Sequence, residues 1–219
     1  MLPQYADLRK EIREIDRKKE YFLEEQKIND YIKQVQKNKY DNNREDLWFG
    51  YYALARVLFK TKPINYYKKI VENIQKSIKY CGVSECDNKS KSYWLLARTY
   101  RECFGSCKND KSLLLYKRCE FYYRSIKNST PEINMLLADL LNNIVYITKD
   151  INTLLESLEI YEELYKQSEV EKEDIDVIYE TAYLTYEYHN MKLHSNYYLN
   201  KITTDEILHN IKQDNMITA

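Results

Sequence analysis

The chain contains little of what tight turns require. Its 219 residues include only 3 glycines and 3 prolines, far below ordinary usage. β-Hairpins depend on glycine-containing turns, and both residue types interrupt helices. This scarcity argues against a hairpin-rich β fold and predicts an all-α chain. It also excludes a glycine-rich phosphate-binding loop.

Long apolar segments are missing as well. No run approaches the about 18 apolar residues that a membrane-spanning helix needs. The first segment, MLPQYADLRKEIREIDRKKE, is too charged for a secretory signal. Five cysteines, an odd number without such a signal, are typical of reduced thiols. We therefore expect a cytoplasmic protein that does not contact a membrane.

Neither sign of charge is in excess. Lysine plus arginine and aspartate plus glutamate number 34 each, so the net charge is zero. This balance makes nucleic acid an unfavoured partner. Interleaved arginines and tyrosines in residues 93–101 and 116–124 keep nucleic-acid binding as an alternative, which a steep salt dependence would reveal.

Residue patterns for catalysis or metal binding are also absent. The three histidines form no HExxH motif, and Glu206 with His209 gives a single ExxH, whereas a di-iron bundle needs two with further carboxylates. The cysteines are spaced too loosely for a zinc site. We therefore expect a protein that is not an enzyme and has no metal or cofactor.

What the chain does contain is an internal repeat marked by alanine. Four of its seven alanines lie in similar contexts, at intervals of 42, 41 and 44 residues. The segments are YYALARVL around Ala55, SYWLLARTY around Ala97, INMLLADLL around Ala138 and DVIYETAYLTY around Ala182. A small side chain among large ones is required where two helices cross at close range.

Each alanine segment is followed by a second helical stretch with its own small residue. These residues are Ser77, Cys119, Ser157 and Ser195. The pattern resembles the tetratricopeptide repeat (TPR). The second repeat carries the resemblance best, through Tyr93, Leu96, Ala97, Tyr100, Cys119, Tyr123 and Pro131. The period of about 42 residues exceeds the about 34 of a TPR, which we attribute to long turns such as residues 102–112. An irregular helical bundle is the alternative.

The resemblance implies an all-α α-solenoid of about four TPR-like helix pairs within residues 41–203. We place the pairs at residues 44–82, 88–128, 131–167 and 172–203. Thr130 before Pro131, a Thr153–Glu156 capping box and Thr204 predict helix starts. A C-terminal capping helix, to about residue 213, and a tail occupy 204–219.

The first 40 residues differ from the repeats. Apolar residues at 3–4 spacing predict one long, charged amphipathic helix, bent or packed near residues 23–30. We favour a role as a cap on the first repeat, because terminal repeats must be shielded from water. A homodimer contact through this helix is the alternative.

In TPR arrays, residues of the first helix of each pair line a concave groove. By position, the groove residues are Tyr52, Arg56, Phe59, Trp94, Arg98, Arg101, Met135, Asp139, Asn142, Tyr179, Tyr183 and Tyr186. Arginines over an aromatic floor can hold a carboxylate or phosphate by forked hydrogen bonds. The resemblance thus implies a non-catalytic adaptor or scaffold for a protein or peptide, and an acidic peptide would suit the arginines. A phage or bacterial regulator or inhibitor that docks on a larger complex is an alternative.

Overall fold

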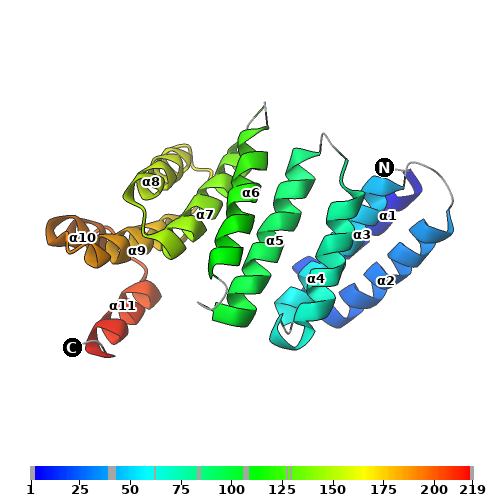
Figure 1. Ribbon diagram of the computed structural model, residues 1–219, viewed down its shortest axis with the longest axis horizontal. Coiled ribbons are helices and arrows are strands. Elements are labelled where there is room, and N and C mark those ends of the chain that lie inside the picture. The colour runs from blue at the N-terminus through cyan, green and yellow to red at the C-terminus, as the bar shows by residue number, and fades with distance from the viewer. Residues whose placement is uncertain are drawn as a thin grey trace. The chain divides into compact units, whose positions relative to one another are not determined.

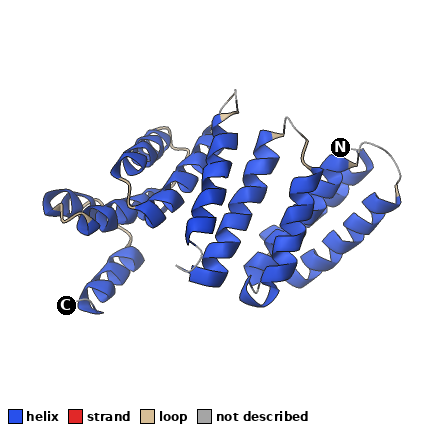
Figure 2. Cartoon of the chain, in the orientation of Figure 1, coloured by secondary structure: helices blue, strands red, loops and turns tan. Residues whose placement is uncertain are grey.

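The computed structural model describes residues 3–38, 43–61, 63–82, 85–105, 109–126, 128 and 130–217. Within these ranges the chain forms eleven helices and no strand (Figure 2). The all-α fold class expected from the sequence is therefore confirmed.

The chain forms two compact units, residues 1–126 and 127–219. The helices of the first unit are α1 (Pro3–Arg17), α2 (Tyr21–Lys37), α3 (Arg44–Thr61), α4 (Pro63–Tyr80), α5 (Cys86–Phe104) and α6 (Asn109–Arg124). Those of the second unit are α7 (Pro131–Thr148), α8 (Ile151–Lys166), α9 (Lys172–Tyr188), α10 (Lys192–Leu199) and α11 (Asp205–Ile217) (Figure 1).

Helices that follow one another in the chain pack as pairs. The four expected pairs are α3 with α4, α5 with α6, α7 with α8, and α9 with α10. In addition, the first helices of neighbouring pairs touch, α3 against α5 in the first unit and α7 against α9 in the second. Stacked first helices are the arrangement from which a groove can be built.

The small residues are buried, and several of them contact the other helix of their pair. Ala55, Ala97, Ala138 and Ala182 are all fully buried, as are Ser77, Cys119, Ser157 and Ser195. In the third pair, the Ser157 hydroxyl of α8 donates a hydrogen bond of 3.0 Å to the Ala138 carbonyl of α7. In the second, the Cys119 thiol donates to the Ser90 carbonyl at 3.2 Å. These contacts leave no room for larger side chains.

The extra length of the repeat lies in the helices, so the prediction of long turns within the repeats is wrong. Helix α5 continues to Phe104 and α6 begins at Asn109, so most of residues 102–112 are helical. The helices of the first two pairs are 18, 18, 19 and 16 residues long. Extended helices with short connections therefore account for the period.

The N-terminal segment contains two helices where the sequence predicts one. Helix α1 ends at Arg17, Lys19 takes a left-handed backbone conformation with φ 58°, and α2 starts at Tyr21. The shift of the apolar pattern reflects this reversal, which precedes the predicted bend at residues 23–30. Helix α2 then packs on α3 (Figure 1), so the apolar face of this segment is used within the chain.

Two of the predicted helix starts are confirmed and one is wrong. The Thr130 hydroxyl accepts a hydrogen bond from the Ile133 amide at the start of α7, and α11 begins directly after Thr204. Thr153 does not cap α8. Instead, Asp150 is the N-cap and accepts from both the amide and the hydroxyl of Thr153 at 2.7 Å. Helix α11 also continues to Ile217, beyond its predicted end near residue 213.

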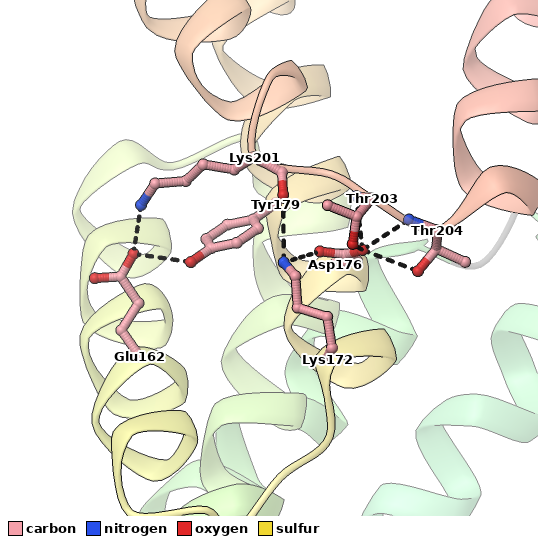
Figure 3. A network of polar contacts seen from close by, with 7 residues as sticks. All are labelled: Glu162, Lys172, Asp176, Tyr179, Lys201, Thr203 and Thr204. Carbon is pink, nitrogen blue, oxygen red and sulfur yellow. Dashed lines mark hydrogen bonds and ion pairs between the residues drawn. The ribbon is translucent and has the colours of Figure 1, made fainter.

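A buried carboxylate holds the connection between α10 and α11 (Figure 3). Asp176 of α9 is fully buried, and its Oδ2 accepts from the amides of Thr203 and Thr204, both at 2.9 Å, and from both hydroxyls. Lys172 lies 2.6 Å from Oδ1. Burial alone would raise the pKa of Asp176, but Lys172 and the two threonines outweigh it and lower the pKa. Asp176 therefore fixes where α11 starts.

We predict that Asp176→Ala costs about 3 kcal/mol in the free energy of unfolding, because several donors lose a charged acceptor. Hydrogen exchange at the Thr203 and Thr204 amides should accelerate. Since the folded pKa is lowered, the contribution of Asp176 should be present at neutral pH and lost as the pH falls through that pKa. The exposed Asp205→Ala should cost less than about 1 kcal/mol. If both amides were as well protected from exchange in Asp176→Ala as in wild type, the role of Asp176 in holding this connection would be contradicted.

The packing constraint predicts a second effect. Ala97→Leu should destabilise the first unit by about 1–3 kcal/mol, because the added atoms meet closely packed neighbours. The matched control is Ala6→Leu, at an exposed position of α1 in the same unit, with an effect within about 0.5 kcal/mol. Urea denaturation followed by circular dichroism measures both. A tolerated Ala97→Leu would show that close approach is not required there.

Candidate functional site

A groove runs between the first helices of the first two repeats. Its volume is about 540 Å³, and α3 and α5 supply most of its lining. The lining residues are Tyr52, Arg56, Phe59, Lys60, Pro63, Trp94, Leu95, Arg98 and Glu102. Five of the residues carried over from the resemblance, Tyr52, Arg56, Phe59, Trp94 and Arg98, thus lie together.

The guanidinium of Arg98 packs against two aromatic rings. Its Cζ is 5.2 Å from the ring centroid of Phe59 on α3 and 4.9 Å from that of Trp94 on α5. The carboxylate that it faces is Glu102, one helical turn along, at 3.7 Å from Nη2. Among the described residues, the buried Nε has no hydrogen-bond partner. Because the rings restrict its rotation, Arg98 offers an oriented donor to a ligand.

Arg56 occupies the equivalent position of the first repeat but has different neighbours. Its Nη2 is 2.7 Å from Asp16 Oδ2 at the end of α1, and 3.9 Å from the buried Glu24 Oε1 of α2. Lys60, one turn further along α3, reaches the other oxygen of Asp16. The two arginines therefore differ in their ion pairs: Arg56 lies 2.7 Å from Asp16, whereas Arg98 lies 3.7 Å from Glu102.

The floor of the groove is fixed by packing and hydrogen bonds. Tyr52 stacks on Trp48 with ring centroids 5.3 Å apart and an interplanar angle of 10°. The indole Nε1 of Trp48 donates to the Ser92 hydroxyl at 3.1 Å, and Ser92 contacts Ser77 at 3.0 Å. Burial raises the pKa of Tyr52 to about 12, although nearby Arg56 acts in the opposite direction. Tyr52 is therefore a neutral part of the floor.

Comparisons with known proteins fit this arrangement. No family model and no curated protein sequence matches the chain. Among solved structures, nearly identical TPR-like repeats from a Podosopora anserina protein assigned as a kinesin light chain align with a TM-score of 0.60 at 10% identity, over 90% of this chain and 92% of that chain. A variant of those repeats with one glutamine replaced by methionine aligns with the same TM-score and identity, over 96% of this chain and 97% of that chain.

The fold is TPR-like. At 10% identity the likeness concerns the fold alone. It bears out the TPR-like helical repeat fold to which the sequence pattern points.

Three of the predicted groove residues belong instead to the core of the second TPR-like unit. Tyr179, Tyr183 and Tyr186 are only 7%, 6% and 4% exposed, so their assignment to an open groove is wrong. They have the same offsets from Ala182 as the groove residues have from Ala55. The difference is that α10 covers them, since Tyr198 stacks on Tyr186 at 5.7 Å and contacts Tyr179 at 5.9 Å.

The remaining expected residues lie outside this groove. Arg101 is on α5 but does not line it, and its Nη2 is 3.7 Å from Glu102. Asn142, Met135 and Asp139 are half-buried on α7 in the second unit. Asp139 accepts a hydrogen bond from the Tyr161 hydroxyl of α8, so it holds the third pair together.

Sequence reasoning missed the charged neighbours of the groove. Glu102 follows Arg98 by four residues, a spacing that predicts a contact on one helix face. Asp16 and Glu24 gave no such signal, because they reach Arg56 only after the chain reverses at Lys19.

Two other kinds of site find no support. In the part of the chain described by the structure, no three histidine, cysteine, aspartate or glutamate residues are grouped to hold a metal ion. None of the described helices has the length and apolar character to cross a bilayer.

Glu24 is a fully buried carboxyl group whose oxygens accept no hydrogen bond from the described residues. Burial raises the pKa of Glu24 to about 7, and the neighbouring Asp16 adds to this, while Arg56 and Lys60 act against it. Glu24 therefore titrates near neutral pH beside the groove.

We predict that Glu24→Gln becomes more stable relative to wild type as the pH rises from about 5 to about 8. A raised folded pKa means that wild type loses stability over this range, by up to about 3 kcal/mol, because the buried carboxyl must ionise. Chemical denaturation at several pH values measures the difference. Glu25→Gln, which removes the half-buried partner of Lys69, serves as the control. A pH-independent difference for Glu24→Gln would contradict the assignment.

Proposed function

We propose that this protein is a non-catalytic scaffold that binds a peptide segment of a partner protein in the groove between α3 and α5. The observation that carries the proposal is Arg98, which packs on Phe59 and Trp94 and has its ion-pair partner, Glu102, at 3.7 Å. A partner's Asp or Glu side chain would meet this guanidinium through a charge-assisted hydrogen bond.

The size and composition of the groove support a short peptide segment as the ligand. A volume of about 540 Å³ falls within the about 300–1,000 Å³ typical of ligand pockets. The aromatic floor of Tyr52, Phe59 and Trp94 offers contact area of the kind that dominates interface energies. The lining contains neither histidine nor cysteine, which agrees with binding in place of catalysis.

A protein ligand suits the groove better than a nucleic acid. Each cation of the groove has a carboxylate nearby: Asp16 for Arg56 and Lys60, and Glu102 for Arg98. Binding to a phosphate backbone relies on an excess of positive charge. A single acidic side chain beside an apolar one requires only one oriented arginine, which this groove has.

A phage-displayed library of random peptides tests the proposal, with the purified full chain as the selecting protein. We expect enriched peptides to carry an acidic residue next to an aromatic or aliphatic one. Binding should change the fluorescence of Trp94, because Trp94 lines the groove. The other tryptophan, Trp48, is buried beneath Tyr52 and should respond less. Isothermal titration calorimetry then gives the affinity of each synthesised peptide.

Arg98→Glu should weaken binding of the enriched peptides by about 10- to 100-fold, the range expected for a charge-assisted hydrogen bond. Arg98→Lys should lose part of the affinity, because an ammonium cannot reproduce the planar fork. Arg124→Glu, at an exposed position of α6, is the matched control and should leave affinity unchanged. Peptides that bind wild type and Arg98→Glu equally well would place the binding surface elsewhere.

A further inference from the structure

The groove contains a second place for a carboxylate, and the chain itself fills it. Asp16 lies with one oxygen 2.7 Å from Arg56 Nη2 and the other 2.5 Å from Lys60 Nζ. Both cations also line the groove. A guanidinium and an ammonium on the same helix face that both bind one carboxylate form an anion subsite.

We infer that Arg56 and Lys60 form a second carboxylate subsite for which Asp16 competes with an acidic residue of the partner. The inference rests on the proposed function and specifies the ligand further: a peptide with two acidic residues, one for Arg98 and one for the Arg56–Lys60 pair.

The subsite is accessible from solvent. The side chains of Arg56 and Lys60 are 34% and 35% exposed, and that of Asp16 is 16% exposed. An incoming carboxylate can therefore reach the cations before Asp16 has left. Exchange of one carboxylate for another leaves neither cation without a partner at any stage.

The surroundings of Asp16 favour its displacement. Asp16 lies in the last turn of α1, where the partial negative charge of the helix end opposes a carboxylate. The buried Glu24 is also near enough for Asp16 to raise its pKa, so the two carboxylates repel each other once Glu24 ionises, which begins near pH 7. A partner carboxylate approaching from the groove would be free of the helix-end repulsion.

Displacement needs only a side-chain movement, because other contacts hold α1 in place. In the middle of α1, Arg9 is almost fully buried, and its Nε donates to the Tyr31 hydroxyl of α2 at 2.9 Å. The same arginine pairs with the buried Asp46 of α3. The α1 backbone can therefore stay packed while Asp16 changes rotamer.

The test compares wild type and Asp16→Asn in parallel selections from the same library, followed by calorimetry. Each peptide with two acidic residues is paired with analogues in which one is changed from Glu to Gln. We expect Asp16→Asn to raise the affinity for the two-acid peptide by about tenfold. The affinity for the analogue that keeps only the acidic residue for Arg98 should stay the same. Lys60→Gln should lower affinity for the two-acid peptide only.

Glu14→Gln, at an exposed position of the same helix, is the matched control and should alter neither affinity. Circular dichroism and thermal unfolding of Asp16→Asn check that α1 stays folded. If peptides bind in an Arg98-dependent manner but Asp16→Asn changes no affinity, the second subsite is overturned while the proposed function stands. If neither protein enriches a peptide that depends on Arg98, both are overturned.

Discussion

Close approach of paired helices is the constraint on which the rest of this structure depends. Each pair has a fully buried alanine on its first helix and a fully buried serine or cysteine on its second. Contact at this distance fixes the rotation of each helix about its axis. Once the alanine faces inward, the residue one position after it points to another side of the helix. Arg56 and Arg98 occupy this position and line the groove, while Phe59, four positions after Ala55, lies on nearly the same side of α3 as the alanine.

The same offsets produce different environments, because what covers a first helix differs between pairs. In the second pair, Arg98 packs on Phe59 of the first pair. In the first pair, Arg56 has α1 and α2 beside it, and these supply Asp16 and Glu24. In the fourth pair, Tyr198 of the short α10 stacks over the tyrosines. A position in the repeat therefore fixes the direction of a side chain, and the neighbouring helices decide whether it is free, paired or buried.

These relations explain how much the sequence could predict. The helix pairs and their buried small residues follow from periodicity, which is local, and the five groove residues follow from the resemblance to TPRs. The reversal of the chain between α1 and α2 could not be predicted from the sequence, because the usual sequence signal for the end of a helix is a glycine just after it. Among the described residues, the positive-φ positions are Lys19, Lys149, Ser168, Asn190 and a single glycine, Gly105. With 3 glycines in 219 residues, this chain ends several helices without the residue that would reveal it. Contacts that depend on such a turn, including that of Asp16 with Arg56, were therefore beyond sequence reasoning.

The reversal at Lys19 also determines the charge of the groove. A single straight helix over residues 3–37 would carry Asp16 and Glu24 about two turns apart along its axis. Folding back at residues 18–20 instead brings both carboxylates to Arg56, with Asp16 also reaching Lys60. The left-handed conformation of Lys19 costs about 1 kcal/mol, and the Arg9 contacts with Tyr31 and Asp46 offset it by holding α1 against α2 and α3. A short backbone segment thus sets which carboxylates reach Arg56, while Arg98 meets only Glu102 of its own helix among the ion pairs of the described residues.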